Sequence, residues 1–167
     1  ISQLRRLALM NRFIVVIPLI LFLTGCSTAG PRFQDTRFAT EQVASDNTRI
    51  IFYREADVNF LSATLGIDGS IVGALARNGF VVAETAPGVH KISTWVRYTR
   101  TGEFVTNMSF VAGETYYIRV SNRAERMLYP FAGPVGAALM VVDRKGEFQL
   151  ESVPPAIALL QLRELKL

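Results

Sequence analysis

The sequence predicts a mainly β protein: a single antiparallel β-sandwich with an N-terminal leader before it and a short helix after it. Short β-branched and aromatic runs follow one another from residue 49, and glycine-containing turns separate them at regular intervals. The 167 residues suit one domain. We divide the chain into a signal peptide (1–25), a flexible tether (26–48), the sandwich (49–151) and a C-terminal helix (152–167).

Residues 1–25 have the three-part order of a bacterial signal peptide. Basic residues come first, an apolar run extends from Phe13 to Leu23, and Thr24 and Gly25 supply the small residues of a cleavage site. The apolar run has about 11 residues, whereas a helix needs about 20 to span a hydrocarbon core. A permanent transmembrane helix is therefore the poorer interpretation. Met10 is an alternative translation start, because a complete leader follows it.

The four residues Leu23-Thr24-Gly25-Cys26 resemble the lipobox of bacterial lipoproteins. In that class the cysteine takes diacylglycerol, the bond before it is cut, and the new amino group is acylated, for example with palmitate. The resemblance implies lipidation of Cys26 and a membrane as partner. In a Gram-negative host, Ser27 implies the periplasmic face of the outer membrane, with the inner membrane as the alternative. The other interpretation is an ordinary signal peptide followed by a chance cysteine.

The charge distribution argues against nucleic-acid binding. Of the 18 basic residues, Arg5, Arg6 and Arg12 precede Cys26, which leaves 15 against 14 acidic residues and a net charge of +1 in place of +4. Most of the basic excess therefore belongs to the leader, and the expected mature domain lacks the large positive charge of a typical nucleic-acid binder.

Seven strands are expected in the first part of the sandwich. They span residues 49–54, 61–67, 70–76, 80–83, 89–98, 103–111 and 115–121. The turns between them include Asp68-Gly69, Arg77-Asn78-Gly79, Pro87-Gly88, Thr101-Gly102 and Ala112-Gly113. The apolar residues of 89–98 are spaced as in a helix, but the β-branched content favours a strand with an irregularity.

The last third of the chain has a weaker pattern. Residues 122–136 are expected to form an unusually apolar loop, followed by a buried strand at 137–142, a turn at 143–146 and a returning strand at 147–151. Pro154 and Pro155 suit the start of a helix, and Ile157, Leu160 and Leu165 share one broad face beyond them. For the earlier segment 27–48, packing of Phe33 or Phe38 on the domain is the alternative to a free tether.

Four motifs stand in an order that resembles a known family. They are RIIFYR at 49–54, IDGSIVG at 67–73, PGVH at 87–90 and AGETYY at 112–117. The order resembles the domain-of-unknown-function-2846 family of small bacterial lipoproteins, over residues 48–150. The resemblance implies a prealbumin-like or immunoglobulin-like β-sandwich without established catalytic residues. We interpret five motif residues as structural turn residues: Asp68, Gly69, Pro87, Gly88 and His90.

The sequence contains no convincing catalytic constellation. His90 is the only histidine, and a triad with Asp68 and a serine lacks a nucleophile-elbow motif. One histidine and one lipidated cysteine do not supply a metal site, and we expect no metal and no cofactor. Four aromatic residues are assigned to the core in preference to a ligand face: Trp95, Tyr98, Tyr116 and Tyr117. Five arginines are assigned to a mixed surface in preference to a basic edge: Arg97, Arg100, Arg119, Arg123 and Arg126.

These observations predict a non-catalytic binding or assembly module of the bacterial cell envelope, anchored by lipid and working with an envelope protein partner. The alternative is a lipid-anchored hydrolase that acts on an envelope polymer. The missing catalytic constellation favours the first.

Overall fold

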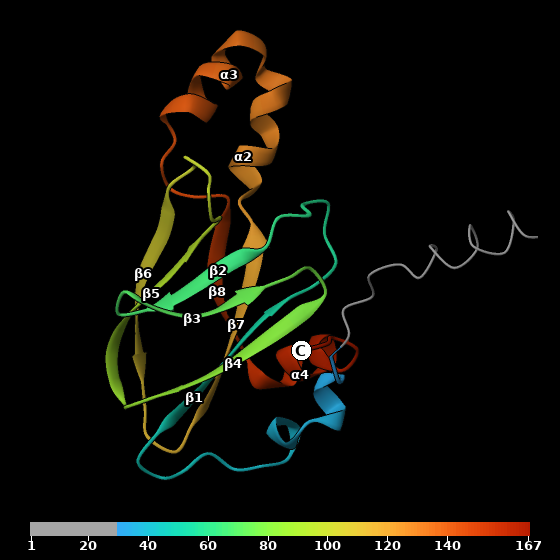
Figure 1. The fold of residues 1–167 in the computed structure, drawn as a ribbon, viewed down its shortest axis with the longest axis vertical. Helices are drawn as coiled ribbons and strands as arrows, with labels where there is room; N and C mark the ends of the chain where they lie inside the picture. The colour runs from blue at the N-terminus through green and yellow to red at the C-terminus, as the bar shows by residue number, and fades with distance from the viewer. Residues whose placement is uncertain (1–29) are drawn as a thin grey trace, which may run out of the picture.

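The computed structural model describes residues 30–167, so the expected signal peptide and Cys26 lie outside the described residues. Two four-stranded sheets face each other, with a helical segment at one end of the sandwich and a C-terminal helix beside one sheet (Figure 1). The predicted mainly β fold with a short C-terminal helix is confirmed. No helix within residues 30–167 is long and apolar enough to cross a membrane.

The first sheet has the strand order β4-β1-β7-β8. Its strands are β1 (Thr48–Arg54), β4 (Gly79–Thr85), β7 (Thr115–Asn122) and β8 (Phe148–Val153). β1 pairs antiparallel with β4, and β7 pairs antiparallel with β8. β1 and β7 run parallel, an exception to the expected antiparallel arrangement. Parallel pairing of β1 and β7 is possible because a long connection, which includes the whole second sheet, joins the two strands.

The second sheet has the strand order β3-β2-β5-β6 and is antiparallel throughout. Its strands are β2 (Ala63–Ile67), β3 (Ser70–Leu75), β5 (Gly88–Trp95) and β6 (Glu103–Phe110). The seven strands expected before residue 122 are therefore all present. The run expected to extend to Tyr98 ends at Trp95, because Tyr98 has a φ of 63° and leaves the extended conformation.

The main core lies between the two sheets. Ile50 and Phe52 of β1 pack there in one cluster with Leu65 of β2 and Ile92 of β5. The alternate residues of β1, among them Ile51 and Tyr53, belong to a second cluster on the outer face of the first sheet. β1 is buried at every position because both of its faces are covered.

Helix α4 (Pro155–Leu162) and the segment before β1 complete the second cluster. Phe33 lies in the 3-10 helix η2 (Phe33–Asp35) and makes an edge-to-face contact with Phe80, with ring centroids 5.3 Å apart. The backbone N–H of Phe33 also donates to the carbonyl of Leu165 at 2.9 Å. The described part of the expected tether is thus packed on the domain, which is the alternative that the apolar side chain of Phe33 allowed.

The segment between β7 and β8 corrects the sequence interpretation. In place of a loop and a buried strand at 137–142, it forms α2 (Ala124–Leu128), the 3-10 helix η4 (Tyr129–Ala132), and α3 (Gly133–Val142). The prediction of a strand was wrong because Ala137, Ala138, Leu139 and Met140 are good helix formers and β8 occupies the edge beside β7. These helices project beyond the end of the sandwich, far from α4 (Figure 1).

Candidate functional site

The helices between β7 and β8 form an exposed apolar element, which we call the helical projection (residues 124–142). Residues 127–142 contain no charged side chain. Phe131, in η4, is 87% exposed. Six other large apolar side chains of the projection are also exposed: Met127, Leu128, Val135, Leu139, Met140 and Val142. Apolar side chains exposed in such number on one element usually mark a site of contact with a partner or a membrane.

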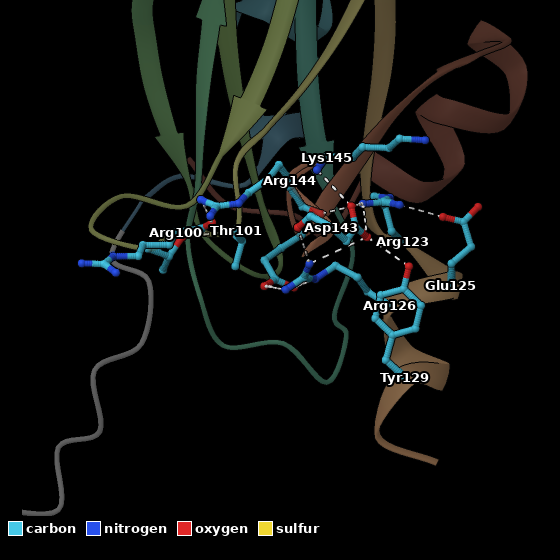
Figure 2. Close-up of polar contacts among 12 residues, drawn as sticks. Arg100, Thr101, Arg123, Glu125, Arg126, Tyr129, Asp143, Arg144 and Lys145 are labelled. Atoms are coloured by element: carbon cyan, nitrogen blue, oxygen red, sulfur yellow. Dashed lines mark hydrogen bonds and ion pairs between the residues drawn. The ribbon is translucent and has the colours of Figure 1, made fainter. Parts of the chain in front are cut away.

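The base of the projection is held by a buried ion network (Figure 2). Arg123 follows β7, and Asp143 follows α3, so the two residues mark the entry and the exit of the projection. Arg123 Nη1 donates to the two carboxylate oxygens of Asp143 at 3.0 and 3.1 Å and to the carbonyl of Gly146 at 3.0 Å. The side chains of Arg123 and Asp143 are only 7% and 8% exposed.

A second arginine extends the network. Arg126 Nε donates to Glu147 Oε2 at 2.9 Å, and Arg126 Nη1 donates to the backbone carbonyl of Asp143 at 3.2 Å. The hydroxyl of Tyr129 and the backbone N–H of Lys145 donate to the Asp143 carboxylate at 3.1 and 3.0 Å. Because these donors lie before, within and after the projection, Asp143 fixes the projection to the sandwich at several points.

The protonation of Asp143 follows from these contacts. Burial disfavours the charged carboxylate, but the hydrogen bonds from Arg123, from the Lys145 backbone and from Tyr129 outweigh it and lower the pKa of Asp143 to about 2. The carboxylate is therefore ionised at neutral pH and fully engaged. Such a group serves as a structural anchor and is poorly suited to act as a proton acceptor in catalysis.

Four exposed basic residues lie on two segments that meet beside the base of the projection, and we call them the basic collar: Arg97, Arg100, Arg144 and Lys145. The loop between β5 and β6 carries the first two, and the segment after α3 carries the others. Gly102 pairs with Lys145, and the backbone N–H of Gly146 donates to the carbonyl of Thr101 at 2.9 Å, which joins the two segments. In the part of the chain that the structure describes, no collar side chain forms an ion pair.

The fit between these two segments requires glycine at position 102. Gly102 has a φ of 87°, which L side chains rarely adopt, and an added Cβ would collide with the carbonyl oxygen of Arg144. The collar is thus built on a close backbone contact. Exposed acids near it are Glu103 and Glu125, and Glu125 pairs with Arg123 at 2.8 Å.

Two of the sequence-predicted turn residues meet at the other end of β5. Asp68 Oδ2 lies 2.6 Å from Nδ1 of His90, and Asp68 Oδ1 accepts the backbone N–H of Lys91 at 2.8 Å. Nε2 of His90 lies 2.9 Å from the carbonyl oxygen of Ala86. Asp68 and Gly69 have φ values of 51° and 82°, and Gly88 has a φ of 136°. The Asp-Gly turn and the Pro87-Gly88 turn are therefore linked to each other through His90.

The contacts of His90 favour a charged cross-link over a catalytic dyad. Both ring nitrogens face acceptors, so both donate when the imidazole is protonated. The hydrogen bond to Asp68 raises the pKa of His90, and the same bond lowers the pKa of Asp68. A catalytic histidine needs a nitrogen that is free to accept a proton from a hydroxyl, whereas Nε2 of His90 donates to a carbonyl.

The Asp68–His90 contact should make stability depend on pH. Because the pKa of His90 is raised, its stabilising contribution is complete below the ordinary value of 6.5 and is lost as pH rises through the raised pKa. Because the pKa of Asp68 is lowered, the contribution is also lost as pH falls below 3.8 through the lowered pKa. The difference in melting temperature between wild type and His90→Gln should therefore be largest between these limits and should shrink as pH rises through the raised pKa of His90. A difference that stays constant from pH 5 to pH 9 would contradict the ionic cross-link.

The other residues singled out in the sequence are dispersed. The surface assignment was wrong for Arg123 and Arg126, which are buried in the network. Arg119 pairs with Glu151 at 2.6 Å, so the five arginines do not form one basic edge. The core assignment was wrong for Tyr98, which is fully exposed, whereas Tyr116 packs on Phe110 with ring centroids 4.9 Å apart. The aromatic residues therefore do not gather on one ligand face.

The two arginines of the first family motif are also structural. Arg54 is fully buried, donates to both carboxylate oxygens of Asp57 at 2.7 and 2.8 Å, and lies 4.4 Å from the centre of the Phe148 ring. Arg49 donates to Glu84 at 2.8 Å and to the carbonyl of Glu41 at 2.7 Å. These contacts hold the loops at the two ends of β1 and explain why arginine stands at both ends of the strand.

Together these features define a two-sheet β-sandwich with a helical insertion between its last two strands. A family model, described as protein of unknown function (DUF2846), matches residues 44–134, which is more than half of the chain. The chain belongs to this family, as its four motifs predict. The match ends at Pro134, so most of α3, β8 and α4 lie beyond it. No curated protein and no solved structure matches the chain significantly.

Proposed function

We propose that this protein is a lipid-anchored, non-catalytic binding or assembly module of the bacterial cell envelope, and that the helical projection is its working surface. The observation that carries the proposal is the exposure of Phe131 on an uncharged segment whose base is fixed by buried ions. The Arg123–Asp143 network fixes the position of this apolar segment, which a segment without a binding role would not require. A rigidly held apolar surface lowers the entropic cost of binding.

Two observations support a non-catalytic role. Both ring nitrogens of His90 are occupied, and the buried carboxylate of Asp143 is held by Arg123. The hydrolase alternative gains no support from any of these contacts.

The proposed anchor is the acylated Cys26, with the outer membrane as destination because Ser27 follows it. Leu167 donates its backbone N–H to the carbonyl of Pro31 at 3.0 Å, so packing on the domain begins at that point. Residues 27–30 span at most about 14 Å when fully extended. A lipid on Cys26 would therefore hold the domain close to the bilayer, in contrast to the longer reach of a tether that extended to residue 48.

Site-specific photo-crosslinking in intact cells tests whether the projection is the working surface. A photo-reactive amino acid at position 131 should give an adduct, whether with a protein or with lipid, because the projection would be in contact with its partner. The matched control is position 89, since Val89 is also strongly exposed but lies at the opposite end of β5. Absence of any adduct at position 131, or equal adducts at both positions, would contradict the proposal.

A further inference from the structure

The geometry points to a bilayer surface rich in anionic headgroups as the occupant of the helical projection and its basic collar. Phe131 and its apolar neighbours would enter the interface, and the collar would lie among the headgroups. This inference rests on the proposed function in one respect, since it takes the projection as the working surface. The partner of that surface is then lipid.

The length and composition of α3 agree with shallow insertion. The helix has 10 residues, from Gly133 to Val142, and is therefore about 15 Å long. That is about half of a hydrocarbon core, so the projection could enter one leaflet but could not span the bilayer. None of the side chains of α3 is charged. Helices that are apolar on all sides occur inside proteins or in membranes. One side of α3 packs on η4, and four of its large apolar side chains are exposed: Val135, Leu139, Met140 and Val142.

The position of the charges matches a membrane interface. The apolar tip is free of charge, and four exposed cations gather at its base: Arg97, Arg100, Arg144 and Lys145. An apolar face with adjoining basic residues is the pattern of proteins that lie in the headgroup region. Each cation near an anionic surface strengthens binding by about fivefold. Tyr98, which is fully exposed between two collar arginines, adds an aromatic ring of the kind that is enriched at this depth.

A second copy of the chain fits this surface less well. In a symmetric dimer formed through the projection, the same patch of each copy would face its partner. Residues 127–142 of the partner copy carry no charge, so this patch would cover the apolar side chains but would offer no opposite charge to the collar of either copy. An anionic lipid surface offers apolar depth and the opposite charge at once. The lipid expected on Cys26 would hold the domain at a membrane, and two attachments together bind more stably than one.

Vesicle flotation tests the inference directly. The described members of both hydrophobic clusters lie between Phe33 and Leu165, so a chain that begins at Gly30 retains them and lacks the apolar leader. We expect this chain to float with vesicles of phosphatidylethanolamine and phosphatidylglycerol, and to bind vesicles of phosphatidylcholine much more weakly. Phe131→Asp should reduce binding at least tenfold. Arg100→Glu combined with Lys145→Glu should reduce it by at least about 25-fold, because two cations are lost.

Matched controls carry the same chemical changes elsewhere. Val89→Asp places the same charge at another exposed apolar position, and Arg163→Glu reverses an exposed cation in the C-terminal segment. Both should bind vesicles like wild type. Thermal melting checks that each variant is folded.

Three results would overturn the inference. The wild-type chain could fail to float with anionic vesicles, or Val89→Asp could weaken binding as much as Phe131→Asp. The third is a concentration-dependent dimer that Phe131→Asp dissolves, without any binding to lipid, which would assign the projection to a second copy. If vesicles are not bound but position 131 crosslinks to an envelope protein in cells, the lipid inference fails while the proposed function stands.

Discussion

Asp143→Asn is expected to release the helical projection from the sandwich. The substitution keeps the size of the side chain but removes the charge that lies between Arg123 and Arg126, whose side chains are 7% and 9% exposed. Breaking a buried ion pair by removing one partner costs about 3–5 kcal/mol when the remaining charge has no other partner, and the exposed Glu125 should offset only a small part of this cost for Arg123. Glu147 still accompanies Arg126 at 2.9 Å, so most of the cost should fall on Arg123 and the first turn of α2.

Urea unfolding and hydrogen exchange would measure this effect. We expect Asp143→Asn to lower the free energy of unfolding. Relative to wild type, it should also accelerate amide exchange in residues 124–142 more than in β1. Glu125→Gln is the matched control, because Glu125 also pairs with Arg123 but is 73% exposed, and exposed pairs contribute less than about 1 kcal/mol. If Asp143→Asn and Glu125→Gln had equal effects, the network would not be the support of the projection.

The same network also determines how far the pH can fall before the projection loses this stabilisation. Since the pKa of Asp143 is lowered to about 2, its contribution to stability is present above the ordinary carboxyl value of 3.8 and is lost as pH falls toward 2. The projection should therefore remain attached in mildly acidic solution. This behaviour contrasts with the Asp68–His90 contact, which loses its contribution on the alkaline side as well.

The strands were predictable because their signals are local. β-branched runs, period-two burial and glycine turns are written in a few consecutive residues, and they give the seven strands up to residue 122. The C-terminal helix follows from two prolines and an apolar face in the same way. The strand prediction for residues 137–142 was wrong because a short apolar run does not distinguish a strand from a helix. The alanines of α3, with Gly133 and Pro134 before them, were the available signal.

The candidate site could not be predicted because it depends on tertiary contacts. Arg123 and Asp143 meet only because the chain leaves the end of β7 and returns at the start of β8. Asp68 and His90 were both assigned to turns, but their contact follows from the register of β2 and β5, in which Ile67 pairs with Ile92. Sequence patterns place residues on elements, whereas strand order and register decide which of those residues meet.

Cys26→Ala is expected to abolish lipid attachment, which is the largest effect on location that the chain offers. A thiol is needed to take diacylglycerol, and alanine has none. The chain from Cys26 onward carries a net charge of only +1, so the projection and collar alone should give weak, salt-sensitive binding. Without the lipid, the protein should leave the membrane fraction or, where the leader is not cut, remain with a larger mass.

Intact mass spectrometry and density-gradient fractionation measure both parts of this prediction. Wild type should show a mature chain that begins at Cys26 with added lipid and should migrate with outer-membrane markers. Ser27→Asp should shift the protein to the inner membrane, while Ser27→Ala, a change of similar size without charge, should not. An unmodified N-terminus at another residue would disprove the anchor. Wild-type protein in the inner-membrane fraction would instead overturn the destination but not the lipid, since the sorting expected from Ser27 would act only on an acylated chain.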